Sequence, residues 1–254
     1  NLRIVIAGKG SDVAAPLENM TYNDKTVPVM YYNKKAEKVD KPVFSKPIPE
    51  GVTVKTVYDQ NIEAIGGREA VEKVNSLMMK GNATIQGMNV KMTRKLTSDG
   101  KSLMEMTMGG NVLSKQVFDG ESGYSMMRGQ KKEMSEEEIE KQKKSDEIFP
   151  ELTVDKNDEL TAIVPVDGED AYVVKTGENT KNYYSVETGY KIMDETTVEQ
   201  GGKEVTNKSK YQNYQEVNGI KMPMIVKREY GPMSFKLEME EVKFDEGVSA
   251  SDFE

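Results

Sequence analysis

Apolar and polar residues alternate along most of the chain after residue 81, and methionine fills many of the apolar positions. Met88, Val90 and Met92 form one such series, and Met104, Met106 and Met108 form another. Successive side chains of a strand point to opposite faces, so each series lies on one face of its strand. The pattern predicts an antiparallel sheet with one methionine-rich apolar face and one solvated face.

Turn signals divide this region into short strands. Asp99-Gly100, Gly109-Gly110 and Asn218-Gly219 are dipeptides typical of tight turns, and Asn-Gly is the strongest short hairpin signal among them. The strands expected from these boundaries cover 82–86, 88–96, 102–108, 111–119, 123–129, 160–166, 171–176, 181–187, 190–199, 211–217, 220–230 and 234–244.

Helices are expected before this region and once within it. Apolar residues recur at helical spacing over 54–65, and Gly66-Gly67 ends that helix. A shorter helix is expected over 68–76, and a third over 135–144, where Ser135 and Glu138 form a capping box. The expected fold class is therefore α+β: a strongly curved antiparallel sheet forming an incomplete β-barrel, with capping helices.

The first residues of the chain differ from the rest. Residues 1–8 form an apolar run that predicts a buried strand, followed by a helix over 12–19 and a strand over 27–32. Two strands and one helix cannot bury a core alone, so 1–33 is interpreted as the remnant of a preceding domain in a processed or cut chain. Residues 34–50, with three prolines and many charges, predict an extended linker, and 51–254 the main domain.

Composition narrows the chemistry. The chain has 17 methionines and no histidine, cysteine or tryptophan, which removes disulfides, thiol chemistry and histidine-dependent catalysis. We therefore predict no enzymatic activity, no cofactor and no metal site in this chain. The net charge of −8 argues against nucleic acid as a partner. No apolar window approaches the ~18 residues of a membrane span.

Two local patterns contain residue types that occur in catalytic or metal sites. Ser122 in DGESGY lacks the glycine spacing of a hydrolase elbow and has no histidine to activate it. The acidic clusters at 136–138 and 238–241 lack a calcium-loop pattern and are interpreted as solvated faces. A hydrolase without a recognisable motif remains the third hypothesis for function.

The methionine-rich face is the candidate site. Unbranched thioethers adapt to irregular shapes, and a concave apolar face suits an acyl chain, a lipidated protein or an apolar peptide. The helix over 135–144, which connects two strands, is the expected lid. The alternative is a filled interior, in which methionine only fills gaps and the domain serves for docking. The residues expected to line the cavity are Met88, Val90, Met92, Met104, Met106, Met108, Met126, Ile192, Leu237 and Met239.

An ordered series of motifs resembles domains of the LolA/LolB type, which sort outer-membrane lipoproteins. The first is QNIEAIGGREAVEKVNSLMMKGNATIQGMNVKM, which begins at Gln60, and it is followed by KQVFDGESGY, IFPEL, DAYVVK, YYSVETGYKI, YQEVNGIKMP and EGVSASDFE. The resemblance covers roughly 52–254. It implies an unclosed, sharply curved barrel whose helices cap an apolar cavity for acyl chains, in a protein that is periplasmic or associated with the outer membrane. Arg94 is given no lid-latching role.

A variant of this domain occurs as the C-terminal extension of insulinase-type (M16-like) zinc peptidases. The segment NLRIVIAGKGSDVAAPLENM resembles the last strand and helix of such a peptidase. The resemblance implies an upstream peptidase domain as a partner. The inverted zinc motif H-x-x-E-H is absent because the chain has no histidine, so zinc and proteolysis are not transferred to this chain.

Overall fold

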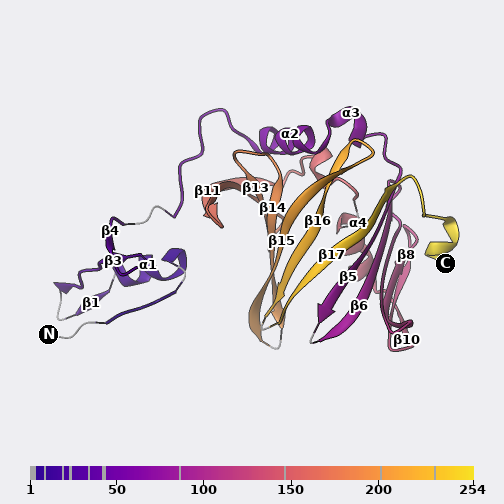
Figure 1. The fold of residues 1–254 in the computed structure, drawn as a ribbon, viewed down its shortest axis with the longest axis horizontal. Coiled ribbons are helices and arrows are strands. Elements are labelled where there is room, and N and C mark those ends of the chain that lie inside the picture. The colour runs from indigo at the N-terminus through magenta and orange to yellow at the C-terminus, as the bar shows by residue number, and fades with distance from the viewer. Residues whose placement is uncertain are drawn as a thin grey trace.

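The computed structural model describes residues 4–8, 10–18, 20–22, 25–33, 35–41, 44–85, 87–145, 147–200, 202–231 and 233–254. A single 13-stranded antiparallel sheet dominates these residues, in the order β10-β9-β8-β7-β6-β5-β17-β16-β15-β14-β13-β12-β11 (Figure 1). Neighbours in this order are mostly consecutive in the chain, and only β5 and β17 pair across a long separation. β10 and β11 remain the two ends of the order, so the barrel is incomplete, as the sequence predicts.

The strands of this sheet are long and irregular in register. Register shifts occur at four described pairs of strands, and such bulges bend strands and increase their twist. The bounds are β5 (Ser76–Ile85), β6 (Met88–Thr97), β7 (Ser102–Met108), β8 (Asn111–Phe118), β9 (Gly123–Met127), β10 (Gln130–Glu133), β11 (Glu159–Val166), β12 (Glu169–Thr176), β13 (Thr180–Ser185), β14 (Lys191–Gln200), β15 (Lys203–Val217), β16 (Ile220–Tyr230) and β17 (Met233–Phe244).

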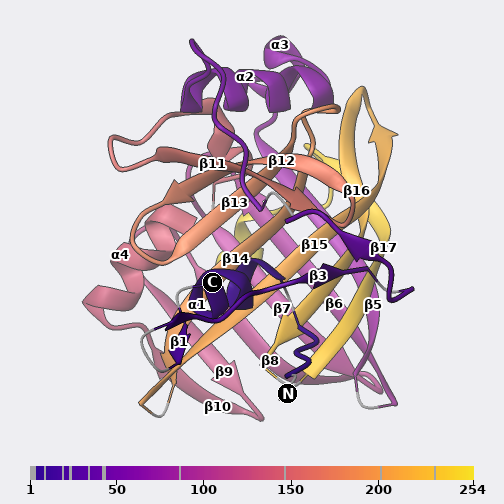
Figure 2. The ribbon, with the colours of Figure 1, turned by 90° about the vertical axis from the view of Figure 1, so that its left-hand side faces the viewer.

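Two helices cover one end of the barrel, α2 (Val54–Ile65) and α3 (Arg68–Val71) (Figures 1 and 2). α2 begins with a capping box between Thr53 and Thr56. Gly66 ends it with φ of +146°, and a Cβ there would lie 2.4 Å from the carbonyl oxygen of Gly219. Only glycine allows this close approach of the helix end to the β15–β16 turn.

A core cluster lies between these helices and the sheet. It joins α2 and α3 to β5, β6, β16 and β17, and its buried members are Ile62, Ile65, Val71, Val74, Leu77, Leu96, Phe149, Ile220, Val242 and Phe244. A second cluster packs the start of α2 on β11–β13 through Val57, Tyr58, Ile163, Tyr172, Val174 and Tyr184. The face of the sheet that contacts α2 is its concave face, and the other face is called convex below.

Helix α4 (Glu136–Ser145) connects β10 to β11, the two end strands. Its capping box is formed as predicted: the Ser135 backbone N–H donates to Glu138 (2.7 Å), and the Glu138 N–H donates to the Ser135 hydroxyl (3.3 Å). Two short 3₁₀ helices complete the domain, η1 (Pro150–Leu152) and η2 (Ala250–Phe253). Phe253 of η2 packs on the convex side of β7 and β8, against Leu103 and Val117.

The N-terminal residues depart from the prediction. Residues 4–8 form no strand, and Ile4, Val5 and Ile6 are exposed, whereas a buried strand was expected over 1–8; residues 1–3 lie outside the described residues. An apolar run becomes a buried strand only where a sheet edge accepts it. The elements that follow are short: α1 (Gly10–Glu18), β1 (Thr21–Tyr22), β2 (Lys25–Thr26), β3 (Tyr31–Tyr32) and β4 (Lys38–Val39).

Three other expectations need correction. The helix predicted over 68–76 ends at Val71, and Ser76 already begins β5. The predicted linker is not wholly unpaired, because β4 pairs with β3 and Lys46 forms an isolated bridge with Ile163. The polar half of β15 before residue 211 was not predicted as strand, yet it pairs with β14 and β16 along its length.

Candidate ligand-binding face

The register of five strands brings the central methionines together on the concave face. Met92 of β6 pairs with Gly81 of β5 on one side and with Met106 of β7 on the other. Leu237 of β17 pairs with Ala83 of β5 and with Val226 of β16. These residues form one cluster whose buried members are Ala83, Met92, Val226 and Leu237, and against which Ile85, Met106, Tyr211, Phe235 and Met239 pack.

A glycine on β5 makes room for one side chain of this cluster. Gly81 lies on β5 between the two cluster strands β6 and β17, and a Cβ there would lie 3.2 Å from Cδ1 of Leu237 and 2.6 Å from the carbonyl oxygen of Glu238. The missing side chain leaves room for Leu237 to lie across β5. An isolated glycine in a strand often marks such a close approach.

Four more of the predicted residues lie on this face, namely Val90, Met104, Met88 and Met108. Val90 pairs with Ala83 and is buried. Met104 pairs with Arg94, which stands two positions from Met92 and therefore on the same face. Met88 and Met108 lie at the ends of β6 and β7 that are distant from α2, and Met88 is 45% exposed.

Two predicted residues lie elsewhere. Met126 pairs with Lys115, which pairs with Glu105 on the convex face; Met127 instead pairs with Ser114, which pairs with Met106. Ile192 lies at the register shift between β13 and β14 and packs on a convex-face cluster. That cluster is formed by Val166, Ala171, Val173, Tyr183 and Met193.

Gln142 of helix α4 forms hydrogen bonds with two side chains of the concave face. Nε2 of Gln116, on β8, donates to Oε1 of Gln142 (2.7 Å), and Nε2 of Gln142 donates to the Ser102 hydroxyl of β7 (3.3 Å). Ser102 and Gln116 both flank Met104 on this face. α4 therefore occupies the position expected of a lid beside the methionines.

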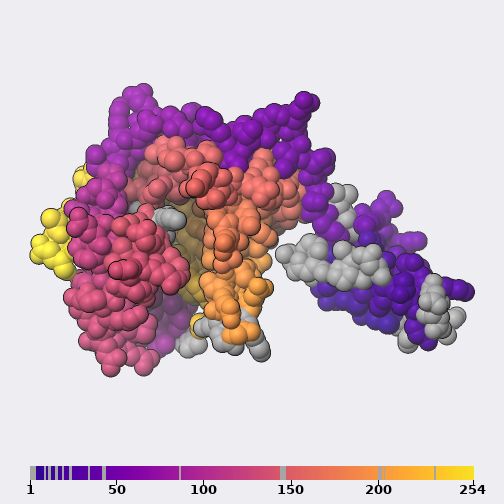
Figure 3. All heavy atoms as spheres, turned by 180° about the vertical axis from the view of Figure 1, so that it is seen from behind, coloured from indigo at the N-terminus to yellow at the C-terminus, as the bar shows by residue number. Residues whose placement is uncertain are grey.

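A space-filling view shows the concave side as a hollow. It opens between the part of the chain that contains β7–β10 and α4 and the part that contains β13–β15, and the strands β16 and β17 form its floor (Figure 3). The helices α2 and α3 cover one end of it. The methionine cluster thus belongs to a trough rather than to a flat sheet.

Polar groups also reach the concave face. The Tyr211 hydroxyl donates to Asp194, and burial first, then the Asp194 charge, raise the pKa of Tyr211 well above its usual value. Arg228 follows Val226 by two positions on β16 and lies on the same face. Sequence reasoning missed these groups, although the alternation of Met222, Met224, Val226 and Arg228 is a signal that could have placed the arginine on this face.

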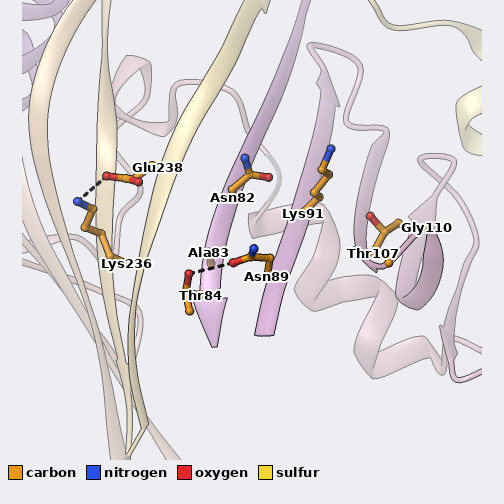
Figure 4. Close-up of a pocket in the computed structure, with 10 residues that line it drawn as sticks. Asn82, Ala83, Thr84, Asn89, Lys91, Thr107, Gly110, Lys236 and Glu238 are labelled. Atoms are coloured by element: carbon orange, nitrogen blue, oxygen red, sulfur yellow. Dashed lines mark hydrogen bonds and ion pairs between the residues drawn. The ribbon is translucent and has the colours of Figure 1, made fainter. Parts of the chain in front are cut away.

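Two grooves formed by the described residues are not lined by methionine. One, of about 600 Å³, is lined by Asn82, Asn89, Lys91 and Thr107 (Figure 4), which the strand register places on the convex face. The other, of about 370 Å³, is lined by residues 210–214 of β15, by Val166, Asp167 and Glu169 where β11 turns into β12, and by Thr188, Tyr190 and Ile192. The methionine-lined surface is the open trough itself.

The weaker candidates for catalysis or metal binding form ordinary structural contacts. Asp119 accepts hydrogen bonds from the Glu121 N–H (2.8 Å) and from the Ser122 N–H and hydroxyl (2.7 and 2.9 Å), which makes the segment a turn between β8 and β9. Within the described ranges, no group of three or more acidic side chains is arranged to hold a metal ion. No helix in the part of the chain that the structure describes has the length and apolar character needed to cross a membrane.

Comparison with known proteins gives structural matches and no sequence matches. No family model matches the sequence, and no curated protein matches it. A LolA superfamily protein from Nitrosomonas europaea superposes with a TM-score of 0.53 at 12% identity, covering 80% of this chain and 98% of that one. A DUF1329 family protein from Desulfovibrio piger gives 0.52 at 13% identity, covering 79% and 97%. At such identities the similarity concerns the fold alone. The chain therefore has a LolA-like fold, an incomplete antiparallel barrel with capping helices.

Proposed function

We propose that this protein binds a hydrophobic ligand, such as the acyl chain of a lipid or lipidated protein or an apolar peptide, in its methionine-lined trough. The observation that carries the proposal is the cluster of Met92, Met106, Leu237 and Met239 on the concave face. Thioether side chains are flexible and accept ligands of varied shape. The role is that of a non-catalytic carrier or receptor.

The arrangement around the trough supports this role. α2 and α3 cover one end (Figures 2 and 3), and Gln142 of α4 contacts Gln116 and Ser102 beside Met104, so a bound chain would be shielded from water on several sides. Removing apolar surface from water contributes about 25 cal/mol per Å², which makes such shielding the main source of affinity. The resemblance to lipoprotein-sorting domains agrees with this role, and we place the protein in the periplasm or at the outer membrane on the same ground.

The test is binding of a fluorescent fatty acid to delipidated protein. We expect saturable binding of cis-parinaric acid by the native chain, and its loss in a variant with Met104→Glu and Met106→Glu, because two carboxylates would then face the acyl chain. The matched control is Thr93→Glu with Thr107→Glu, which adds the same charge to the convex face of the same two strands.

Far-UV circular dichroism checks that both variants are folded. Equal affinity in the two double variants would show that the fatty acid binds elsewhere. Absence of saturable binding by the native protein would favour the alternative, a docking domain with a filled interior.

We also propose that the domain is accessory to an insulinase-type peptidase domain. The resemblance of residues 1–33 supports this, and so does the exposure of Ile4, Val5 and Ile6, at 68, 92 and 50%. An exposed apolar run of this kind would complete a sheet in a neighbouring domain. The reading frame before Asn1 should encode H-x-x-E-H; a frame without that motif would contradict the peptidase connection.

A further inference from the structure

A partly buried arginine lies on the concave face beside the methionine cluster. Arg228 pairs with Phe235 of β17 and with Ser209 of β15. Val226, two positions before Arg228 on β16, pairs with Leu237 of β17, and these two side chains are 3% and 2% exposed. The guanidinium therefore lies in the trough, at the end of the strands that is distant from α2.

Within the described part of the chain, this guanidinium is poorly partnered. Its Nη1 donates to the Tyr230 hydroxyl (3.2 Å), and its Nε is buried with no hydrogen-bond acceptor. None of the ion pairs between described residues includes Arg228, and the nearby carboxylate of Asp194 accepts from Tyr211. Guanidinium has five donors in a planar fork, so several remain available here.

A buried donor without an acceptor destabilises the folded protein, and the cost is larger when the group is charged. A ligand that supplies an anionic oxygen would remove this cost and form a charge-assisted pair, which is the geometry that guanidinium shares with carboxylates and phosphates. The net charge of −8 gives the protein no general attraction for anions, so such a preference would be local to this side chain.

We propose that the ligand of the trough is an amphiphile with one anionic head group, a carboxylate or a phosphate ester, held by Arg228. The inference rests on the proposed function and makes it specific. The head group pairs with Arg228 near the open end of the strands. The hydrocarbon chain extends over the partly exposed side chains of Phe235, Met106 and Met239, which pack on the buried cluster, toward the end covered by α2.

The test compares ligands that differ only in their head group. Delipidated protein is loaded with Nile red, a neutral probe, and titrated with dodecanoic acid, dodecyl phosphate and dodecanol. We expect the acid, the phosphate or both to displace the probe at a concentration lower than that of the alcohol by roughly tenfold or more. The reason is that only the anionic head groups form a charge-assisted hydrogen bond with Arg228. Their relative potency identifies which anionic group the site accepts.

The variants assign this preference to one side chain. Arg228→Gln should abolish the difference between acid and alcohol, while Arg228→Lys should keep part of it. Lys227→Gln is the matched control, because it removes one positive charge from the adjacent, exposed position on the convex face and should leave the preference unchanged.

Each outcome bears on a different claim. Equal displacement by acid, phosphate and alcohol in the native protein would overturn the head-group inference and leave the hydrophobic trough in place. A preference that persists in Arg228→Gln would overturn the assignment to Arg228. Failure of all three ligands, and of Nile red itself, to bind would refute the proposed function as well.

Discussion

The two ends of the trough differ in how tightly the same strands are packed. Beneath α2, the concave residues Leu77 and Leu96 are each 2% exposed, and Ile62 of the helix is 1% exposed. At the opposite end of these strands, Met88, Met233 and Met127 are 45, 47 and 67% exposed. One apolar face thus changes from a closed core into an open surface over the length of a strand.

We infer from this difference that the covered end mainly stabilises the fold and that the open end is available to a ligand. The buried members of the clusters at the covered end are branched and aromatic side chains, whose restricted shapes pack densely. The open end holds methionines, which leave apolar surface available to a ligand. Substitutions at the first end should therefore unfold the protein, and those at the second should change binding with little loss of stability.

Alkaline pH should have the largest effect, and it acts on the covered end. Burial is the main cause that raises the pKa of Tyr58, Tyr184 and Tyr214 above the usual value of 10. Above pH 10 the unfolded chain releases these protons and the folded chain does not, so stability is complete below pH 10 and falls as pH rises. Each such tyrosine contributes up to about 1.4 kcal/mol per pH unit.

Urea unfolding at pH 8, 10 and 11 measures this fall, and absorbance at 295 nm reports tyrosine ionisation. We expect the buried tyrosines to ionise only as circular dichroism is lost. Tyr184→Phe should flatten the dependence on pH above 10. Complete tyrosine ionisation near pH 10 in a protein that stays folded would contradict the packing described here.

Truncation of one residue at each end tests the comparison directly. Leu77→Ala removes a fully buried side chain beneath α2 and should lower the free energy of unfolding by about 4 kcal/mol. Met106→Ala, on the open part, should cost about 1 kcal/mol. Chemical denaturation measures both values. Equal losses would mean that the methionine cluster is part of a filled core.

The contact of α2 with the barrel depends on Gly66. Gly66→Ala places a Cβ 2.4 Å from the Gly219 oxygen at a φ of +146°, and should cost about 3 kcal/mol. Gly110→Ala is the control: its φ of +83° is also positive but no atom lies within 4 Å of the new Cβ, so about 1 kcal/mol is expected. A thermal unfolding series on both variants decides whether the close approach matters.

The smallest effect concerns the lid. Hydrogen bonds from Ser135 and Lys132 lower the pKa of Glu138 to about 2. A lowered pKa stabilises the folded helix above the unfolded value near 4.5, and this contribution is lost as pH falls toward 2. Glu138→Gln should therefore speed amide exchange in α4 at pH 6, whereas Glu136→Gln, outside the capping box, should change it little. Identical exchange in both variants would exclude a role for the capping box.

Much of the fold was predictable because its signals are local. Alternation, glycine turns and the Ser135–Glu138 capping box located most strands, α2 and α4. The errors occurred where tertiary pairing decides the structure. The run at 76–80 reads equally well as helix or strand, and pairing with β17 makes it strand. Residues 203–210 are polar, and only their two neighbouring strands make them part of β15.

The sequence predicted which residues of one strand share a face, but it could not predict for every strand which of its two faces is the concave one. Met88, Val90 and Met92 share a face by alternation alone, and hairpin registry adds Met104 and Met106. The phase of β9 depends on the turn at 119–122, so the choice between Met126 and Met127 could not be made from the sequence. A register shift between β13 and β14 likewise displaced Ile192.

The most direct test of the trough uses the methionines as probes. In protein labelled with ¹³C at the methionine methyl groups, titration with a fatty acid should shift the signals of Met92, Met104, Met106 and Met239 saturably. Met78 beneath Gly247 and Met193 in the convex cluster serve as internal controls and should not move. Shifts confined to Met78 or Met193, or no shifts at any methionine, would contradict a hydrophobic ligand site on the concave face.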